Sequence, residues 1–112
     1  MAVETTDIAQ AIWLNNKRLD KGMDILTEAS KKYAEEESKY RKSLSIEIMK
    51  LRDAKIPVSL ISDIAKGNLS KELFARNIAE FEYKACRDKL NSIQVETNAL
   101  QSLLRVYSNI GE

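Results

Sequence analysis

Apolar residues return every seven positions along the first half of the chain, and this spacing constrains the fold more than any other feature. One row of the repeat consists of Ile12, Leu19, Leu26, Tyr33 and Tyr40. The alternate position of the same register is taken by Met23, Leu44 and Leu51. A seven-residue apolar repeat is typical of long α-helices that pack against a partner along one stripe. We call this stripe the predicted seam.

A second long helix is expected to carry the other half of the predicted seam. Phe74 and Ile78 lead into it, and its residues are Phe81, Cys86, Leu90, Ile93, Leu100, Leu104 and Tyr107. The pattern predicts an all-α fold in which two long antiparallel amphipathic helices form a coiled-coil-like hairpin. A short helix joins them, and residues 1–112 form a single domain that assembles into a helical bundle.

The expected helices cover residues 7–54, 57–66 and 69–109. Asp7 is expected to cap the first helix, with Gln10 completing a capping box. Pro57 ends that helix, because proline lacks an N–H and disfavours helical geometry in the residue before it, and it suits the first turn of the next.

Gly67 and Asn68 are expected to close the short helix, with Gly67 in a left-handed conformation. Asn68 or Ser70 then caps the third helix, which ends before Gly111.

Polar residues interrupt the predicted seam at Asn16, Ser30 and Glu37. We expect Ser30→Leu and Glu37→Leu to raise the melting temperature by filling polar positions with apolar side chains. Gly22 has two interpretations, the close approach of a partner or a soft point in the helix.

Composition narrows the possible functions. The chain has 112 residues, no histidine and one cysteine, Cys86. The lack of histidine removes the commonest general base and, with a single cysteine, nearly every thiolate or imidazole metal site. We therefore assign no catalytic residue, no metal ligand and no cofactor, and interpret Cys86 as a small buried apolar residue. An enzymatic role is not favoured.

The charge balance and the first residues bear on partners and location. Eighteen basic and seventeen acidic residues give a net charge of +1, which does not favour a polyanionic partner. Residues 1–7 contain no basic region followed by a hydrophobic stretch, so we expect no secretory signal and a cytoplasmic location. No apolar run is long enough to cross a bilayer, so no membrane association is expected.

A basic stretch with two tyrosines provides the one candidate nucleic-acid surface. Its candidate contacts are Lys31, Lys32, Lys39, Arg41 and Lys42. Cations can follow a phosphate backbone while tyrosine rings stack on bases. Three glutamates lie among the same residues and both tyrosines belong to the predicted seam, so we favour solvated helix faces.

Several apolar residues lie outside the predicted seam and are candidate contacts to a second chain or another partner. They are Trp13, Leu14, Ile25, Val58, Leu60, Ile61, Ile64 and Leu103. Those of the connecting segment have two interpretations, a cap over the end of the hairpin, which we favour, or an apolar docking patch.

Residues 54–107 resemble small α-helical proteins of unknown function encoded by tailed phages and prophages. The resemblance rests on residues 56–68 (IPVSLISDIAKGN), 83–90 (YKACRDKL) and 97–104 (TNALQSLL). The resemblance implies that the gene lies in an early or recombination region of a phage and that the protein is located in the cytoplasm of a bacterial host. It transfers no catalytic residue.

The sequence leads to a non-enzymatic interaction protein that forms a dimer or tetramer and binds a phage or host protein. Two amphipathic helices of this length bury little apolar surface without a partner. An accessory nucleic-acid-binding protein is the alternative, and capture of a small molecule between subunits is a third hypothesis.

Overall fold

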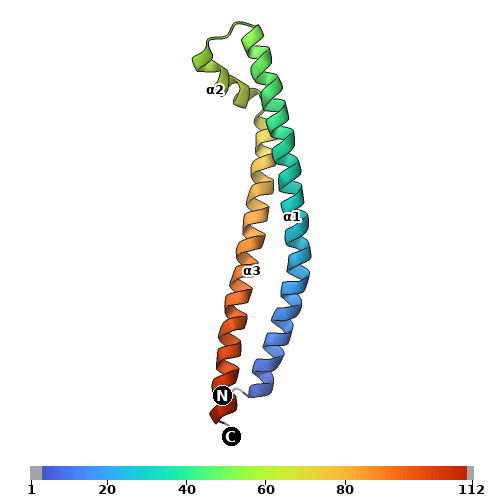
Figure 1. Cartoon of the computed structure of the whole chain (residues 1–112), viewed down its shortest axis with the longest axis vertical. Helices are drawn as coiled ribbons and strands as arrows, with labels where there is room; N and C mark the ends of the chain where they lie inside the picture. Colours follow the sequence, from blue (N-terminus) through green and yellow to red (C-terminus); the bar gives the residue numbers. More distant parts are fainter. Residues whose placement is uncertain (1–3, 111–112) are drawn as a thin grey trace. The chain divides into compact units, whose positions relative to one another are not determined.

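The computed structural model describes residues 4–110 and contains, over that range, three α-helices and no β-strand (Figure 1). Helix α1 spans Thr5–Asp53, α2 spans Val58–Asn68 and α3 spans Ser70–Ile110. The prediction of an all-α fold is confirmed, and each helix end lies within two residues of the predicted one. Gly111 lies outside the described residues.

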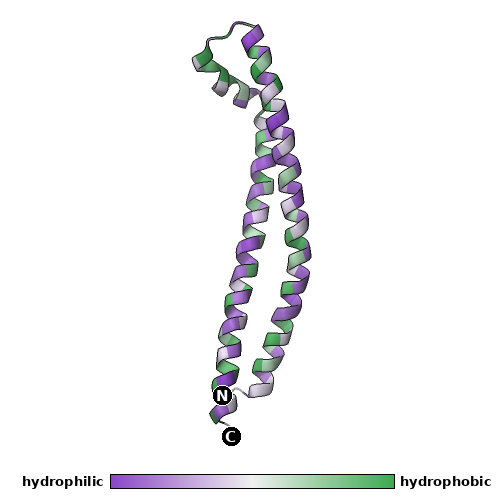
Figure 2. Ribbon diagram, viewed as in Figure 1, coloured by the Kyte–Doolittle hydropathy of each residue, from purple (hydrophilic) through white to green (hydrophobic). Residues whose placement is uncertain are grey.

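The chain forms two compact units, which are described separately. Unit 1 comprises Met1–Thr27 and Lys84–Glu112, and unit 2 comprises Glu28–Tyr83. Hydrophobic and hydrophilic residues are interspersed along all three helices (Figure 2). Hydropathy alone therefore does not show which rows of a helix face inward, whereas the burial of individual side chains does.

Helix α1 begins with a cap three residues earlier than predicted. The carbonyl of Glu4 accepts hydrogen bonds from the N–H groups of Asp7 and Ile8 at 3.0 and 3.3 Å. The Asp7 carboxylate in turn accepts one from the N–H of Glu4 at 3.4 Å. Asp7 is thus the residue that reaches back from inside the first turn, and its predicted role as the cap, with Gln10 as its partner, is wrong.

Helix α1 ends in a left-handed residue rather than through Pro57 alone. Lys55 has φ of 61°. Its N–H donates to the carbonyl of Arg52 at 2.9 Å, and the N–H of Ile56 donates to that of Leu51 at 3.1 Å. These two bonds are those of a Schellman motif, which satisfies the last carbonyls of a helix.

Pro57 precedes helix α2, and Gly67 lies inside it. With ψ of 133°, Pro57 caps the helix instead of forming its first turn. No described glycine has positive φ, so the left-handed conformation predicted for Gly67 is wrong. Asn68 belongs to α2, and its side chain donates to Glu47 Oε1 at 2.9 Å, so it does not cap α3.

A single residue, Leu69, separates α2 from α3. Its N–H donates to the carbonyl of Ala65 at 3.1 Å, and its carbonyl accepts from the N–H of Leu73 at 2.9 Å. Leu69 therefore ends one helix and begins the next, at φ of −105° and ψ of 25°.

The core of unit 1 combines apolar and polar residues from α1 and α3. Its buried residues are Ile8, Asn15, Leu90, Ile93 and Thr97. A Cβ on Gly22 would lie 2.2 Å from Leu90 Cδ2, so the lack of a side chain at Gly22 allows α3 to approach α1 closely. Of the two interpretations of Gly22, close approach is correct, and the approaching residue belongs to the same chain.

The core of unit 2 draws on all three helices. Its buried residues are Tyr40, Ile61, Ala65 and Ala79. The rings of Tyr33 and Tyr83 lie with centroids 5.9 Å apart and tilted by 46°, and the Lys32 ammonium lies 3.9 Å from a Glu82 oxygen. Unit 2 is therefore held by one row of each long helix, with α2 adding Ile61 and Ala65.

The inward row of α1 differs from the predicted seam by one residue in unit 1. The residues predicted on the alternate position are exposed at Asn16 and Met23, the latter by 54%. The inward residues are instead Asn15 and Gly22. In a seven-residue repeat, the second inward position follows the first by either three or four residues. At Gly22 the lack of a side chain lets Leu90 come close, which a methionine at that position would prevent.

The predicted seam is also wrong at Phe81 and Tyr107. Phe81 is 70% exposed because Arg76, Ala79 and Tyr83 occupy the inward face of α3. Tyr107 is 37% exposed, since counting from the contact of Gly22 with Leu90 places it level with the first turn of α1. The other predicted seam residues are buried or half-buried: Ile12, Leu19, Leu26, Tyr33, Tyr40, Leu44, Leu51, Cys86, Leu90, Ile93, Leu100 and Leu104.

The two helical glycines should respond oppositely to alanine. Gly67→Ala should raise the free energy of unfolding by about 0.5–1 kcal/mol, because its Cβ would have no atom within 4 Å and alanine favours the helix. Gly22→Ala should instead lower it by about 1 kcal/mol, because Leu90 must move. Urea unfolding measures both, and a gain at Gly22 equal to that at Gly67 would contradict the close approach.

Lys55→Gly should stabilise the end of α1. A left-handed conformation costs an L-residue about 1–2 kcal/mol, and glycine removes this cost. Glycine also makes the unfolded chain more flexible, which offsets part of the gain, so the free energy of unfolding should rise by about 1 kcal/mol. Ala54→Gly is the control, because Ala54 lacks positive φ and should lose stability. Thermal melts that rank the two variants the other way would contradict the Schellman motif.

Candidate functional site

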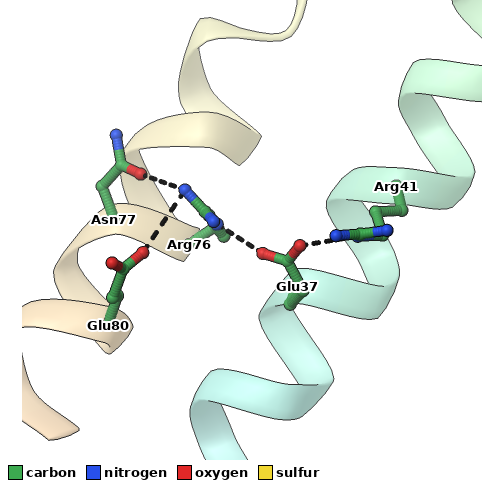
Figure 3. A network of polar contacts seen from close by, with 5 residues as sticks. All are labelled: Glu37, Arg41, Arg76, Asn77 and Glu80. Atoms are coloured by element: carbon green, nitrogen blue, oxygen red, sulfur yellow. Dashed lines mark hydrogen bonds and ion pairs between the residues drawn. The ribbon is translucent and has the colours of Figure 1, made fainter.

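A network of polar side chains joins α1 to α3 inside unit 2 (Figure 3). Glu37 lies between two arginines. Arg41 Nε donates to Glu37 Oε1 at 2.6 Å, and Arg76 Nε donates to Glu37 Oε2. Arg76 Nη1 also donates to Asn77 Oδ1 at 2.9 Å and lies 3.4 Å from Glu80 Oε2. The guanidinium of Arg76 thus faces two carboxylates and one amide oxygen.

The network perturbs the ionisation of its central pair. Hydrogen bonds from Arg41 and then Arg76 lower the pKa of Glu37, and this effect exceeds the opposing effect of burial. The hydrogen bond to Glu37 likewise raises the pKa of Arg76. Both groups are therefore charged at neutral pH and form an ion pair.

Glu37 consequently has a partner that the sequence analysis missed. The side chains of Glu37 and Arg76 are 22% and 27% exposed, so both are largely covered. A leucine at Glu37 would leave Arg76 without its main carboxylate, so the structure argues against the stabilisation expected of Glu37→Leu. Ser30 is exposed, so Ser30→Leu fills no polar gap. The sequence did contain a signal for this pair. Glu37 interrupts the apolar row of α1, and Arg76 lies at the matching height of α3.

The predicted nucleic-acid contacts are mostly engaged with carboxylates. Within unit 2, Lys32 lies 3.9 Å from Glu82, Lys39 lies 3.7 Å from Glu36, and Arg41 binds Glu37. Lys31 and Lys42 are exposed. The basic stretch therefore presents a mixed-charge face.

The tyrosines of the same stretch are not available for stacking on bases. Tyr40 is only 8% exposed, and Tyr33 lies against Tyr83. Stacking requires a free ring face. The interleaved rings that suggested nucleic-acid binding instead fill the space between helices.

Most of the candidate partner contacts lie on the surface. The exposed ones are Trp13, Leu14, Ile25, Val58, Leu60 and Leu103. Ile61 is 6% exposed and is not available as a partner contact, whereas Ile64 is half-buried and remains a candidate. The helical period explains the split, because α2 turns Ile61, Ile64 and Ala65 inward and Val58 and Leu60 outward. Lys17 covers Trp13, with its nitrogen 4.0 Å from the ring centroid.

A row of apolar side chains follows the outside of α3 in unit 2. Phe74, Ile78 and Phe81 are 67%, 41% and 70% exposed. Their spacing of four and three residues places them on one side of the helix. We call these three residues the outer row. Both phenylalanines of the chain belong to it.

Unit 1 contains an apolar groove between α1 and α3, with a volume of about 430 Å³. Gly22, Ile25, Cys86, Leu90 and Ile93 contribute apolar surface to it. Its charged lining residues are Arg18, Lys21 and Lys89. One side of the groove is open to solvent, so it is a depression rather than an enclosed cavity.

Neither a metal site nor a membrane-spanning helix is seen among residues 4–110. No three histidine, cysteine, aspartate or glutamate residues in this range lie close enough together to hold a metal ion. No helix there combines the length and the apolar character needed to cross a bilayer.

Comparisons of the chain with protein-family models, curated proteins and solved structures found no match.

Disrupting the network should destabilise unit 2. Glu37→Leu should lower the free energy of unfolding by about 1 kcal/mol, and a double-mutant cycle with Arg76→Met should give a coupling energy of similar size. The pKa of Glu37 is lower in the folded chain than its unfolded value of about 4.3, so its ionised form stabilises the fold. This contribution to the free energy of unfolding is present above the unfolded pKa and is lost as pH falls through the folded pKa. Unfolding measured between pH 7 and 3 should show this loss in the wild type and not in Glu37→Gln.

Glu35→Gln, on an exposed position two residues away, is the control. An acid-dependent loss of the same size in Glu35→Gln and Glu37→Gln would show that the ion pair makes no specific contribution.

Proposed function

We propose that this chain is a non-enzymatic, self-associating interaction protein in which α1 and α3 form an antiparallel, coiled-coil-like hairpin. The contacts of Lys32 with Glu82 and of Glu37 with Arg76 support the antiparallel pairing, because residue numbers rise along α1 as they fall along α3. The proposal retains a phage or prophage origin, a bacterial cytoplasmic location and a further protein partner.

The observation that carries the proposal is the outer row. A phenylalanine side chain buries about 150–250 Å² when covered, so two rings that are each about two-thirds exposed leave roughly 250 Å² of aromatic surface in water. An area of this size is within the few hundred Å² that soluble monomers expose, so it is the sharing of one helix face by two aromatic rings that favours a partner. Aromatic residues at the centre of an interface commonly contribute most of its binding energy.

A second copy of the chain is the partner that fits the outer row best. In an antiparallel pair of α3 helices, Phe74 of one copy lies level with Ile78 of the other. The same register places Lys71 level with Phe81 and beside Glu82. The ammonium of Lys71 then meets a ring face and a carboxylate at both ends of the contact. Such a contact is self-complementary, as a twofold dimer requires.

A stable dimer buries about 800 Å² on each partner, which exceeds the outer row itself. The row would therefore form the centre of the interface, and the charged residues beside it would form the rim. The polar rim also explains why the flanks of α3 remain hydrophilic around so apolar a row.

Size-exclusion chromatography with light scattering should give twice the mass of one chain at micromolar concentration. Phe74→Ser with Phe81→Ser should give a monomer that keeps its helical circular dichroism, because both side chains are exposed. Val58→Ser, on the 84% exposed position of α2, is the control and should remain dimeric.

A wild-type monomer mass would contradict self-association. Dissociation of Val58→Ser or Leu103→Asp, with the phenylalanine variant still dimeric, would place the interface on α2 or in unit 1 instead. Binding to DNA with a steep salt dependence would favour the alternative, an accessory nucleic-acid-binding protein.

A further inference from the structure

We propose that the groove of unit 1 binds an acidic amphipathic helix of a partner protein. This inference goes beyond self-association and does not depend on it, since the groove and the outer row share no residue. It rests on the shape of the groove, on its apolar surface and on the sign of the charges around it.

The groove exists because small side chains lie where larger ones would fill the space. Gly22 brings the backbone of α1 against Leu90, while Ala85 and Cys86 provide only short side chains from α3. Ile25 is 53% exposed beside this depression. An apolar surface is therefore left uncovered at a concave place, where an incoming side chain would contact both helices at once.

Every charged residue that lines the groove is basic. Arg18 and Lys21 come from α1, and Lys89 comes from α3. Arg18 Nη1 donates to Asn15 Oδ1 at 3.2 Å, a neutral oxygen that leaves its charge uncompensated. Asp20 and Asp24 are near in sequence but do not line the groove. Across the groove, the three cations select a ligand that carries negative charge on both sides of an apolar centre.

A helix fits this groove better than a small amphiphile does. Pockets for small ligands bury about 70–90% of the ligand surface, whereas this groove is open to solvent along one side. A helix laid between α1 and α3 supplies the missing third wall and keeps its polar face in water. Residues 18–25 of α1 and 85–93 of α3 each cover about two helical turns, roughly 10–12 Å. Two or three apolar side chains at helical spacing fill that length.

Cys86 permits a direct test, because it is the only cysteine of the chain and it lines the groove. The probe is a designed helical peptide with leucines at positions i, i+3, i+4 and i+7 flanked by glutamates. Its counterpart carries lysines in place of the glutamates. Binding is measured by fluorescence anisotropy, and occupation of the groove by the rate at which iodoacetamide alkylates Cys86.

The glutamate peptide should bind and slow the alkylation of Cys86 at least about tenfold at saturation, whereas the lysine peptide should do neither. Lys21→Glu with Lys89→Glu should reverse this preference. Lys31→Glu with Lys42→Glu makes the same charge change on exposed residues outside the groove and should leave it intact. The monomeric Phe74→Ser and Phe81→Ser variant should bind the glutamate peptide as the wild type does, which separates this test from self-association.

Any of four results would overturn the proposal. The first is equal binding of the two peptides, and the second is binding of the glutamate peptide without protection of Cys86. The third is protection of Cys86 by dodecanoate but not by the glutamate peptide, which would identify the groove as a site for a small anionic amphiphile. A change in oligomeric mass on Lys21→Glu with Lys89→Glu would likewise assign the groove to a second copy of this chain.

Discussion

Close approach of helix backbones is the constraint on which the packing of each unit depends. A pair of helices buries only one row from each, so the number of fully buried side chains is small and each contact between the rows matters. In unit 1 the lack of a side chain at Gly22 leaves room for Leu90 of the opposite helix, and in unit 2 the small residue Ala79 is 1% exposed. The apolar residues that this row excludes, such as Phe74 and Phe81, then remain on the surface, where they become available to other molecules.

The sequence predicted the helix bounds to within two residues because the seven-residue repeat marks both long helices and Pro57 lies between α1 and α2, although Gly67 does not end α2 as predicted. It predicted the inward rows less well, because a seven-residue repeat does not say whether the third or the fourth residue completes it. Hydropathy favoured Met23 over Gly22 and Phe81 over Arg76, yet the smaller and the charged residue face inward. Close approach and ion pairing depend on the opposite helix, which no single segment of sequence describes. The groove of unit 1 was missed for the same reason.

Polar residues within the inward rows restrict how the helices can align. In unit 2, Glu37 meets Arg76 in only one register, since a shift of one turn would break this contact and leave each partly buried charge only its partner on the same helix. In unit 1, Asn15 is 4% exposed, and counting from the contact of Gly22 with Leu90 places it level with Thr97, which is 1% exposed. Asn15 Nδ2 lacks a hydrogen-bond partner. A buried polar residue of this kind lowers the stability of the fold but favours one alignment of the two helices over others.

The junction at Leu69 shows that the bend between α2 and α3 is a property of tertiary structure. Neither proline nor glycine stands there, and Leu69 departs from helical geometry mainly through its ψ of 25°. Gly67 and Asn68 weaken the helix just before the junction, but both remain helical, so local chain chemistry does not by itself require a break at Leu69. The burial of Ile61 and Ala65 and the hydrogen bond from Asn68 to Glu47 hold α2 in place instead. A peptide comprising only residues 58–110 would lack Glu47, and its joint would have no chemical reason to stay bent.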